Sequence, residues 1–331
     1  MLLSRRIDVE ATALQRHGEL GIWAQLLGQE AAQVGAGRRC GRRTSSSRPT
    51  ASTGGLVPRR RPAPPARSVR GVDQGGWDSA AHNFHLYTIV IGACPARDRL
   101  CHGRPARRTG RHGRPRARPG AVLAHFGDGA SSQGDVNESF IFAASYNAPV
   151  VFLRQNNQWA ISEPIERQSR IPLYQRAGGF GFPGLRVDGN DVLATYAVTQ
   201  YALQRARDGQ GPTLVEAYTY RMGAHTTTDD PTRYRLSDDV EKWKLRDPIA
   251  RVRAYLVRNG LADEGFFAGV DDEATELGRH LREGCKAMPD PGPLSMFDHV
   301  YAEMTDELAA QRDGYADYLA SFEDDLEVAP R

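Results

Sequence analysis

Polar residues that can hold a metal ion follow two apolar runs in the middle of the chain. Gly127-Asp128-Gly129 follows the run 121–126 and Asn156-Asn157 follows the run 149–153, with 26 residues (130–155) between the two motifs. Glycine lets the backbone approach an anion closely. A magnesium ion that holds a diphosphate takes a carboxylate, one or two neutral oxygens and phosphate oxygens. Asp128 and Asn157 therefore form a candidate metal–diphosphate site.

The elements around these motifs predict that the two motifs meet at one edge of a sheet. Both apolar runs have the character of strands, and the stretch from about Val136 to Tyr146 has helical spacing. In a strand–turn–helix–strand unit the motifs lie at the carboxyl ends of parallel strands, where open sheets bind ligands. The helix after the first motif offers N–H groups to an anion. A lone Gly-Asp-Gly is a common turn, but its pairing with Asn-Asn favours the ligand site over a plain turn and loop.

The flanking sequence predicts more strands and helices. Asp191, in the turn 188–191, can cap the helix that follows it. From Val240 to Leu326 the pattern is helical, with breaks near 259–260, 288–293 and Gly314, after a polar loop at 221–238. In chain order we expect an N-terminal helix with Ile7, Ala11 and Leu14 that Gly18 and Gly21 end, a short helix from about Gln29, a strand at 185–187, a helix from Val192 to about Asp208, and a strand at 212–220.

Four motifs resemble the α subunit of a 2-oxo acid dehydrogenase E1 component. The branched-chain type is the most similar and the pyruvate type comes second, and the resemblance covers residues 4–37, 71–93 and 120–331. The spacing of Gly-Asp-Gly and Asn-Asn also resembles the thiamine diphosphate signature. The motifs are GDGASSQGD (127–135), NNQWAISEP (156–164), RVDGNDV (186–192) and YRMGAHTTTDDPTRYR (220–235).

The resemblance implies a thiamine diphosphate-binding fold in a single domain spanning 1–331. We expect an α/β domain with a doubly wound, mostly parallel sheet, helices on both faces, and a helical C-terminal extension at 240–331. By resemblance, magnesium is held by Asp128, the side chain of Asn157 and the backbone carbonyl of Trp159. The diphosphate is lined by Gly127, Gly129 and Ala130.

Three further positions enter the cofactor site by resemblance. Gln155 stands where relatives often carry a phosphate-binding Arg, so one charged contact is missing here. Ile91 would lie under the bend of the cofactor with its carbonyl meeting the aminopyrimidine, and a plain core position is its alternative reading. His225 is the catalytic candidate, because the family's loop carries a His that contacts the diphosphate and faces the incoming lipoyl arm.

Charged neighbours of His225 suggest how its loop is held. Asp229 and Asp230 could fix the tautomer and orientation of the His225 ring. Arg221 and Arg235 could organise the loop by pairing with one of these carboxylates. Surface pairs of this kind contribute little alone.

The activity implied by the resemblance is the decarboxylation of a branched-chain 2-oxo acid, with acyl transfer to the lipoyl group of E2. A β subunit would supply the Glu that activates the cofactor, giving an α2β2 assembly. Pyruvate is the alternative substrate. A self-contained enzyme of the transketolase type would need a second set of strands after residue 240, where the pattern is helical. A chain that binds no cofactor is the rival outside enzymes.

Two Arg-rich segments interrupt this pattern. Residues 38–70 hold ten Arg and no acid, and residues 94–119 hold nine Arg and one acid. Without them, 24 basic residues face 39 acidic ones, so the formal charge of +3 becomes −15. A nucleic-acid-binding arm is one explanation, but such arms usually lie at termini and mix Lys with Arg. We expect no nucleic-acid partner.

Translation in a shifted reading frame of a GC-rich gene explains both segments better. Codons that encode Arg48–Gly55 can read Ser-Tyr-Arg-Glu-His-Gly in a shifted frame, and codons for Cys94–Gly103 can read Ala-Arg-His-Ala-Thr-Gly-Phe-Ala-Met-Gly. These peptides resemble a Tyr-Arg-Glu loop and a helix start that the family carries at these places. Dense like charge without apolar periodicity predicts poor packing of both segments.

Composition bears on the compartment. No stretch is long and apolar enough to span a membrane, and the N-terminus lacks the apolar core of a signal peptide. Four Cys without regular spacing argue against a disulfide framework or a zinc site. A cytoplasmic enzyme without a membrane partner is expected.

Overall fold

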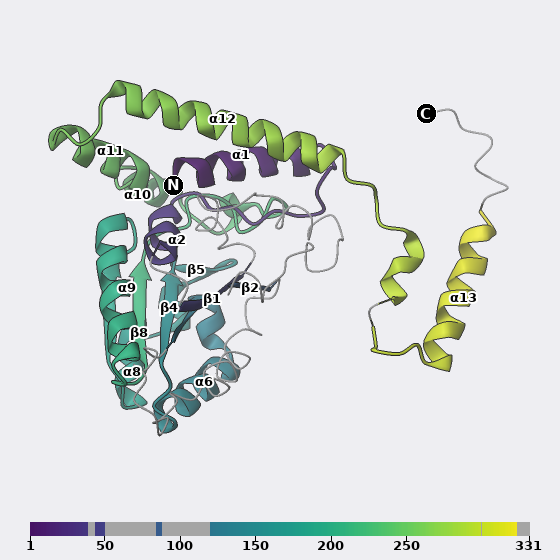
Figure 1. Ribbon diagram of the computed structural model, residues 1–331, viewed down its shortest axis with the longest axis horizontal. Coiled ribbons are helices and arrows are strands. Elements are labelled where there is room, and N and C mark those ends of the chain that lie inside the picture. Colours follow the sequence, from purple (N-terminus) through teal and green to yellow (C-terminus); the bar gives the residue numbers. More distant parts are fainter. Residues whose placement is uncertain (39–43, 50–83, 88–119, 299, 323–331) are drawn as a thin grey trace, which may run out of the picture.

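The computed structural model describes residues 1–38, 44–49, 84–87, 120–298 and 300–322 (Figure 1). For the strands at 44–49 and 84–87 it describes the backbone. Ile91 and most of the two Arg-rich segments lie outside the described residues.

Six strands form one parallel sheet in the order β2-β1-β3-β4-β8-β7. The chain goes from β1 outward to β2 and then adds β3 on the other side of β1, so the strand order reverses between β1 and β3. This arrangement confirms the predicted α/β class with a parallel sheet. The strands span Thr44–Pro49 (β1), Phe84–Tyr87 (β2), Ala121–Gly127 (β3), Val150–Asn156 (β4), Gly184–Asp188 (β7) and Thr213–Tyr218 (β8).

Helices cover both faces of the sheet because the apolar residues of the central strands alternate between two cores. On one face Phe126 and Phe152 pack with Phe140 of α6 (Gly134–Ser145). On the other face Leu123 and Leu153 pack against α2 (Glu30–Gly37) and α9 (Val192–Arg207). Figure 1 shows α9 and α6 on opposite sides of the strands. The central strands β3 and β4 are therefore buried on both faces, as the strands of parallel sheets usually are.

A third core joins the N-terminal helix to the C-terminal part. Helix α1 (Leu2–Arg16) lies along α12 (Glu264–Lys286), and Ile7, Ala11 and Leu14 pack against Leu281 (Figure 1). The connections between β8 and α12 are η5 (Pro231–Arg233), α10 (Ser237–Lys244) and α11 (Pro248–Arg258). Beyond α12, η6 (Pro293–Phe297) and α13 (Asp306–Ala320) stand away from the body. The described residues after 218 contain no strand.

Most predicted elements are confirmed, and the expected break at Gly314 is wrong. Asp191 caps α9, accepting the N–H groups of Leu193 and Ala194 at 2.9 and 3.0 Å. Gly314 lies inside α13 and does not end it; one glycine costs a helix about 1 kcal/mol, which the other residues of the helix offset. The backbone of Thr44–Pro49 pairs with β3 as a strand, although it belongs to the first Arg-rich segment. Backbone pairing needs no apolar side chain.

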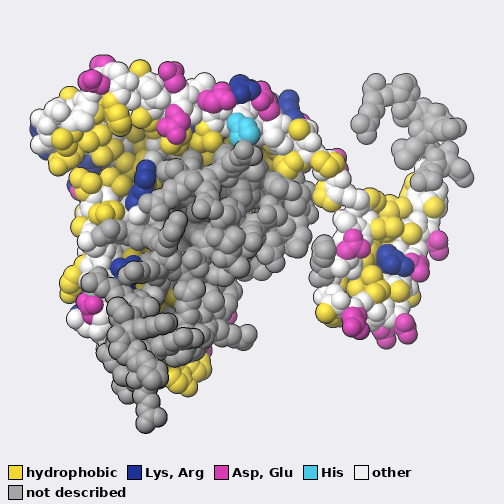
Figure 2. Space-filling model, in the orientation of Figure 1, with side chains coloured by type: hydrophobic (Ala, Val, Ile, Leu, Met, Phe, Trp, Pro, Cys, Tyr) yellow, Lys and Arg dark blue, Asp and Glu magenta, His cyan; other side chains and the backbone are white. Residues whose placement is uncertain are grey.

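Two outer surfaces keep large apolar side chains exposed. Figure 2 shows apolar side chains among acidic ones over α11 and α12 and on the separate C-terminal part. The exposed residues include Tyr255, Val257 and Phe266 on the first surface, and Met296, Tyr318 and Phe322 on the second. No helix among the described residues has the length and apolar character needed to cross a membrane.

Candidate active site

The carboxyl ends of β3 and β4 bring the two sequence motifs together. Gly127 is in register with Gln155, and the Asp128 N–H donates to the Gln155 carbonyl at 3.2 Å. The Asp128 carboxylate is buried and accepts the Asn157 N–H at 3.3 Å. Its second oxygen accepts Gln168 Nε2 at 3.0 Å. Parallel pairing of the two strands therefore places Asp128 beside Asn157, as their positions in the sequence predict.

Gly127 and Gly129 of the first motif stand in different surroundings. Apart from its two chain neighbours, no described residue has an atom within 4 Å of the place where a Cβ on Gly127 would stand, so the described residues leave this side of the backbone open. At Gly129 a Cβ would lie 2.8 Å from Cβ of Ala160, so only glycine lets η3 (Gly129–Ser132) approach β5 (Trp159–Ala160) this closely. An open backbone face at Gly127 fits the approach of an anion.

The turn after β4 holds strained backbone. Gln158 has φ 72° and Ile161 has φ 57°, conformations that residues other than glycine rarely adopt. Side-chain contacts to β8 hold Gln158 there: its Nε2 donates to the Thr219 carbonyl at 2.7 Å and its Oε1 accepts the Tyr218 hydroxyl at 2.9 Å. The surrounding structure thus fixes the turn that presents the Trp159 carbonyl. Strain of this kind is common at ligand sites.

The oxygen donors at this edge suit a hard divalent cation. Burial raises the pKa of the Asp128 carboxyl, although Gln168, Asn157 and the charge of Arg221 act in the opposite direction. A cation at the carboxylate would offset the cost of burying it. No three His, Cys, Asp or Glu side chains converge on a metal site within the described parts of the chain. An ion here would therefore combine Asp128 with neutral oxygens, such as Asn157 Oδ1 and the Trp159 carbonyl, and with oxygens of a ligand.

His225 lies in the loop after β8, with its ring against a buried arginine. Its Nδ1 stands 3.2 Å from Nη1 of Arg221. A guanidinium has no acceptor, so Nδ1 must accept and the neutral ring carries its proton on Nε2. Burial lowers the pKa of the imidazole, the Arg221 charge lowers it further, and Asp229 acts in the opposite direction. His225 is therefore a neutral hydrogen-bond donor at pH 7.

The predicted pairing of this loop is wrong. Asp229 accepts the backbone N–H of His225 at 2.8 Å and the Tyr234 hydroxyl at 2.5 Å, so it does not hold the ring. Arg235 donates to the carbonyls of Arg221, Met222 and Gly223. Asp230 accepts from Thr232. Three carbonyls of the loop face Arg235, which donates to them and pairs with neither carboxylate.

Arg221 joins the two halves of the site, which its sequence position did not reveal. The side chain is buried, and its Nη1 lies 3.3 Å from the Trp159 carbonyl. Its Nη2 donates to the Ile161 carbonyl at 2.5 Å and to the Tyr234 hydroxyl at 3.1 Å. Arg221 therefore fixes the turn after β4 and the His225 ring together.

A second contributor comes from the N-terminal segment. Gln29, just before α2, accepts Gln155 Nε2 at 2.5 Å and Asn157 Nδ2 at 2.9 Å with its single Oε1. The only local signal for it was a buried-looking Gly-Gln-Glu before an apolar helix, which does not distinguish a site residue from a helix start.

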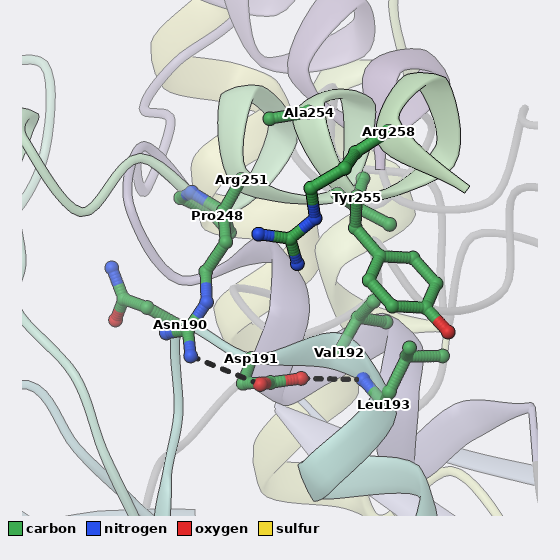
Figure 3. A pocket seen from close by; sticks show the side chains of 10 residues that line it. Asn190, Asp191, Val192, Leu193, Pro248, Arg251, Ala254, Tyr255 and Arg258 are labelled. Atoms are coloured by element: carbon green, nitrogen blue, oxygen red, sulfur yellow. Dashed lines mark hydrogen bonds and ion pairs between the residues drawn. The ribbon is translucent and has the colours of Figure 1, made fainter. Parts of the chain in front are cut away.

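A pocket among the described residues lies away from Asp128 and Asn157, between the start of α9 and α11 (Figure 3). Asp191 caps α9 there and pairs with Arg251 at 3.0 Å, and Arg251 also pairs with Asp188 at 2.5 Å. Asn190 turns from this place toward the site, where its Oδ1 lies 2.6 Å from Thr219 Oγ1. The RVDGNDV motif (186–192) thus has a structural role: it caps α9 and joins it to α11.

A sequence model described as "Dehydrogenase E1 component" matches residues 111–291, which is more than half of the chain and includes Asp128, Asn157 and His225. The chain belongs to this dehydrogenase E1 component family. It is similar over nearly all its length to α subunits of such enzymes.

Three curated relatives of the E1 chain are α subunits. The "3-methyl-2-oxobutanoate dehydrogenase subunit alpha" of Mycobacterium tuberculosis is 42% identical over 321 residues, 95% of this chain and 84% of the relative. The "2-oxoisovalerate dehydrogenase subunit alpha" of Bacillus subtilis is 33% identical, over 92% of this chain and 93% of the relative. The "Pyruvate dehydrogenase E1 component subunit alpha" of Acholeplasma laidlawii is 33% identical, over 96% and 91%.

Proposed function

We propose that this E1 chain is the α subunit of a branched-chain 2-oxo acid dehydrogenase. It would decarboxylate an acid such as 3-methyl-2-oxobutanoate and pass the acyl unit to the lipoyl group of E2. The buried Asp128 carboxylate beside Asn157 and the Trp159 turn carries this proposal. The higher identity to the mycobacterial 3-methyl-2-oxobutanoate enzyme, 42% against 33% for a pyruvate enzyme, favours the branched substrate.

The cofactor we propose is thiamine diphosphate with magnesium, on the thiamine diphosphate-binding fold of the family. Asp128, Asn157 Oδ1 and the Trp159 carbonyl would hold the ion, and their hard oxygens fit it. The diphosphate would lie along Gly127, Gly129 and Ala130, and the open side of Gly127 supports this placement. Bound there, the cofactor supplies the electron sink for decarboxylation. Ile91 would support its ring system.

His225 would act as a fixed donor. With Nδ1 turned to Arg221, its Nε2–H is the group available to the diphosphate or to the incoming lipoyl arm. Gln155 brings no charge to the diphosphate, and its amide already donates to Gln29. Binding would therefore depend strongly on the metal.

A β subunit and an E2 lipoyl domain are the partners we propose, in an α2β2 assembly. Exposed apolar side chains on α11 and α12 and on the C-terminal part support a protein partner for these surfaces (Figure 2). Isolated chain and β subunit should each be inactive, because the Glu that activates the cofactor would come from β.

We also propose that segments 38–70 and 94–119 are out of frame. Their composition supports this, because dense Arg, Pro, Ala and Gly are typical of a GC-rich gene read out of frame. The missing Tyr-Arg pair would otherwise give the diphosphate a charge-assisted donor, and its loss costs about 2–3 kcal/mol. Resequencing codons 36–72 and 92–121 from source DNA tests this: an intact frame contradicts it. Activity should require the restored frame and the β subunit.

Replacing Asp128 by Ala tests the cofactor site. The change removes the single carboxylate at the proposed ion, so calorimetric titration with magnesium–thiamine diphosphate should show binding lost in the frame-restored chain with its β subunit. Asp135→Ala, which removes an exposed carboxylate from the first turn of α6, is the matched control and should bind normally. Equal affinity of the Asp128 variant and its parent would sink the assignment.

A further inference from the structure

We propose that Gln29 is a positioning residue for the metal site, which orients the Asn157 amide so that its oxygen faces the ion. This inference rests on the proposed function. Gln29 is 3% exposed and comes from the N-terminal segment, 128 residues from Asn157 in the sequence.

The hydrogen bonds around Gln29 fix which way the Asn157 amide points. Gln29 Oε1 accepts Asn157 Nδ2 at 2.9 Å, while Asn157 Oδ1 accepts the Trp159 N–H at 3.1 Å. Turning the amide over would set an oxygen against an oxygen and an NH2 group against an N–H. The contact with Gln29 thus keeps Oδ1 on the side of the Trp159 turn, where the resemblance expects a metal ligand.

The Gln29 side-chain amide cannot rotate by half a turn either, because two donors converge on its Oε1. Gln155 Nε2, two residues before Asn157, donates to Gln29 Oε1 at 2.5 Å, and Gln29 Nε2 lies 3.5 Å from the Gln25 carbonyl. A turned Gln29 would oppose its NH2 group to two other NH2 groups. The single Gln29 Oε1 therefore fixes the orientation of the side-chain amides of Gln155 and Asn157.

The backbone under Gln29 is held at several points. The Leu27 carbonyl accepts the Met222 N–H at 3.1 Å, and Thr219 Oγ1 lies 2.9 Å from the Gly28 carbonyl. The Gly28 N–H donates to Glu30 Oε2 at 3.0 Å, and Glu30 pairs with Arg5 at 2.8 Å. A residue on such a fixed segment can position another, since supporting contacts limit its own movement.

The first test observes the amide itself and needs no cofactor. The full chain is labelled with ¹⁵N-asparagine, and the Asn157 side-chain resonance is identified by its loss in Asn157→Asp. Gln29→Leu removes the acceptor and should shift this resonance and speed its exchange with water. Gln29→Glu keeps an acceptor and should restore slow exchange. An Asn157 resonance that is unchanged in Gln29→Leu would overturn the inference.

The second test measures magnesium–thiamine diphosphate binding by calorimetry in the frame-restored chain with its β subunit. Gln29→Leu should bind about three- to tenfold more weakly, the effect of one hydrogen bond. Gln33→Leu changes a second buried Gln, which lies inside α2, and should stay within about twofold of the parent. Equal weakening in both variants, or none in Gln29→Leu, would overturn the positioning role. A parent that binds no cofactor would contradict the proposed function, while the Asn157 resonance still decides the orientation.

Discussion

The two halves of the candidate site, the sheet edge at 127–159 and the loop at 219–235, are positioned by different means. At the sheet edge, parallel pairing of β3 with β4 sets Asp128 beside Asn157. In the loop, no strand reaches His225, and tertiary hydrogen bonds from Arg221, Arg235 and the segment before α2 hold the backbone. Strand pairing thus sets the position of Asp128 beside Asn157, whereas the loop, like the orientation of the Asn157 amide, depends on side-chain contacts between residues far apart in the sequence.

The two halves of the site should therefore differ in their sensitivity to substitution. Sheet pairing spreads the positioning of Asp128 over many backbone hydrogen bonds, so no single side chain is essential to it. The loop relies on a few buried polar side chains, above all Arg221. Substitutions in the loop's supports should therefore disturb the site more than most substitutions near the strands.

Arg221→Leu should have the largest effect. It leaves the carbonyls of Trp159 and Ile161 and the ring of His225 without their donor, so unfolding free energy should fall by about 2–4 kcal/mol. Activity of the complex should be lost. Thermal and denaturant unfolding measure the first effect.

The matched control is Arg251→Leu, which removes an exposed arginine paired with Asp188 and Asp191. Exposed ion pairs contribute little, so its cost should stay below about 1 kcal/mol. If the two arginine variants lose the same stability, the loop does not depend on Arg221 as described.

Gly28→Ala should have an intermediate effect, because it disturbs the contact between the N-terminal segment and the loop. Gly28 has φ 91°, and a Cβ there would lie 2.7 Å from the Tyr220 carbonyl. Gly18 has φ 79° with no atom within 4 Å, so Gly18→Ala carries the backbone strain without the clash. We expect Gly28→Ala to lose about 1–2 kcal/mol more stability than Gly18→Ala. Equal losses of stability in the two variants would show that the backbone around Gly28 and Tyr220 can shift to accept a Cβ.

The smallest effect should be the pH dependence due to His225. Its pKa in the folded chain lies below the ordinary value of 6.5, so the unfolded chain binds the proton more readily. The stability that neutral His225 contributes is present above about pH 6.5 and is lost as the pH falls below it. Between pH 7.5 and 5.5 the parent should lose up to about 1 kcal/mol more than His225→Gln. A parent that loses less than the variant would contradict a lowered pKa.

The sequence predicts the strands at the sheet edge better than the contacts that hold the loop. Apolar runs predicted β3 and β4, and the short-range signal at Asp191 predicted the cap of α9, because these features depend on neighbours in sequence. Gln29 and the carbonyl contacts of Arg221 could not be predicted, since a polar residue before a helix or in a loop has many possible partners. The expected pairing of Arg221 with Asp229 failed for this reason.

We propose that Asp128, Asn157 and Trp159 hold the metal of a thiamine diphosphate cofactor. A crystal structure of the frame-restored complex with manganese and thiamine diphosphate tests it most directly, because manganese can be located by its anomalous scattering. We expect one peak at the carboxyl ends of β3 and β4, about 2.0–2.2 Å from the Asp128 carboxylate, Asn157 Oδ1 and the Trp159 carbonyl. A peak that lacks contact with Asp128, or a bound diphosphate far from Gly127, would contradict it.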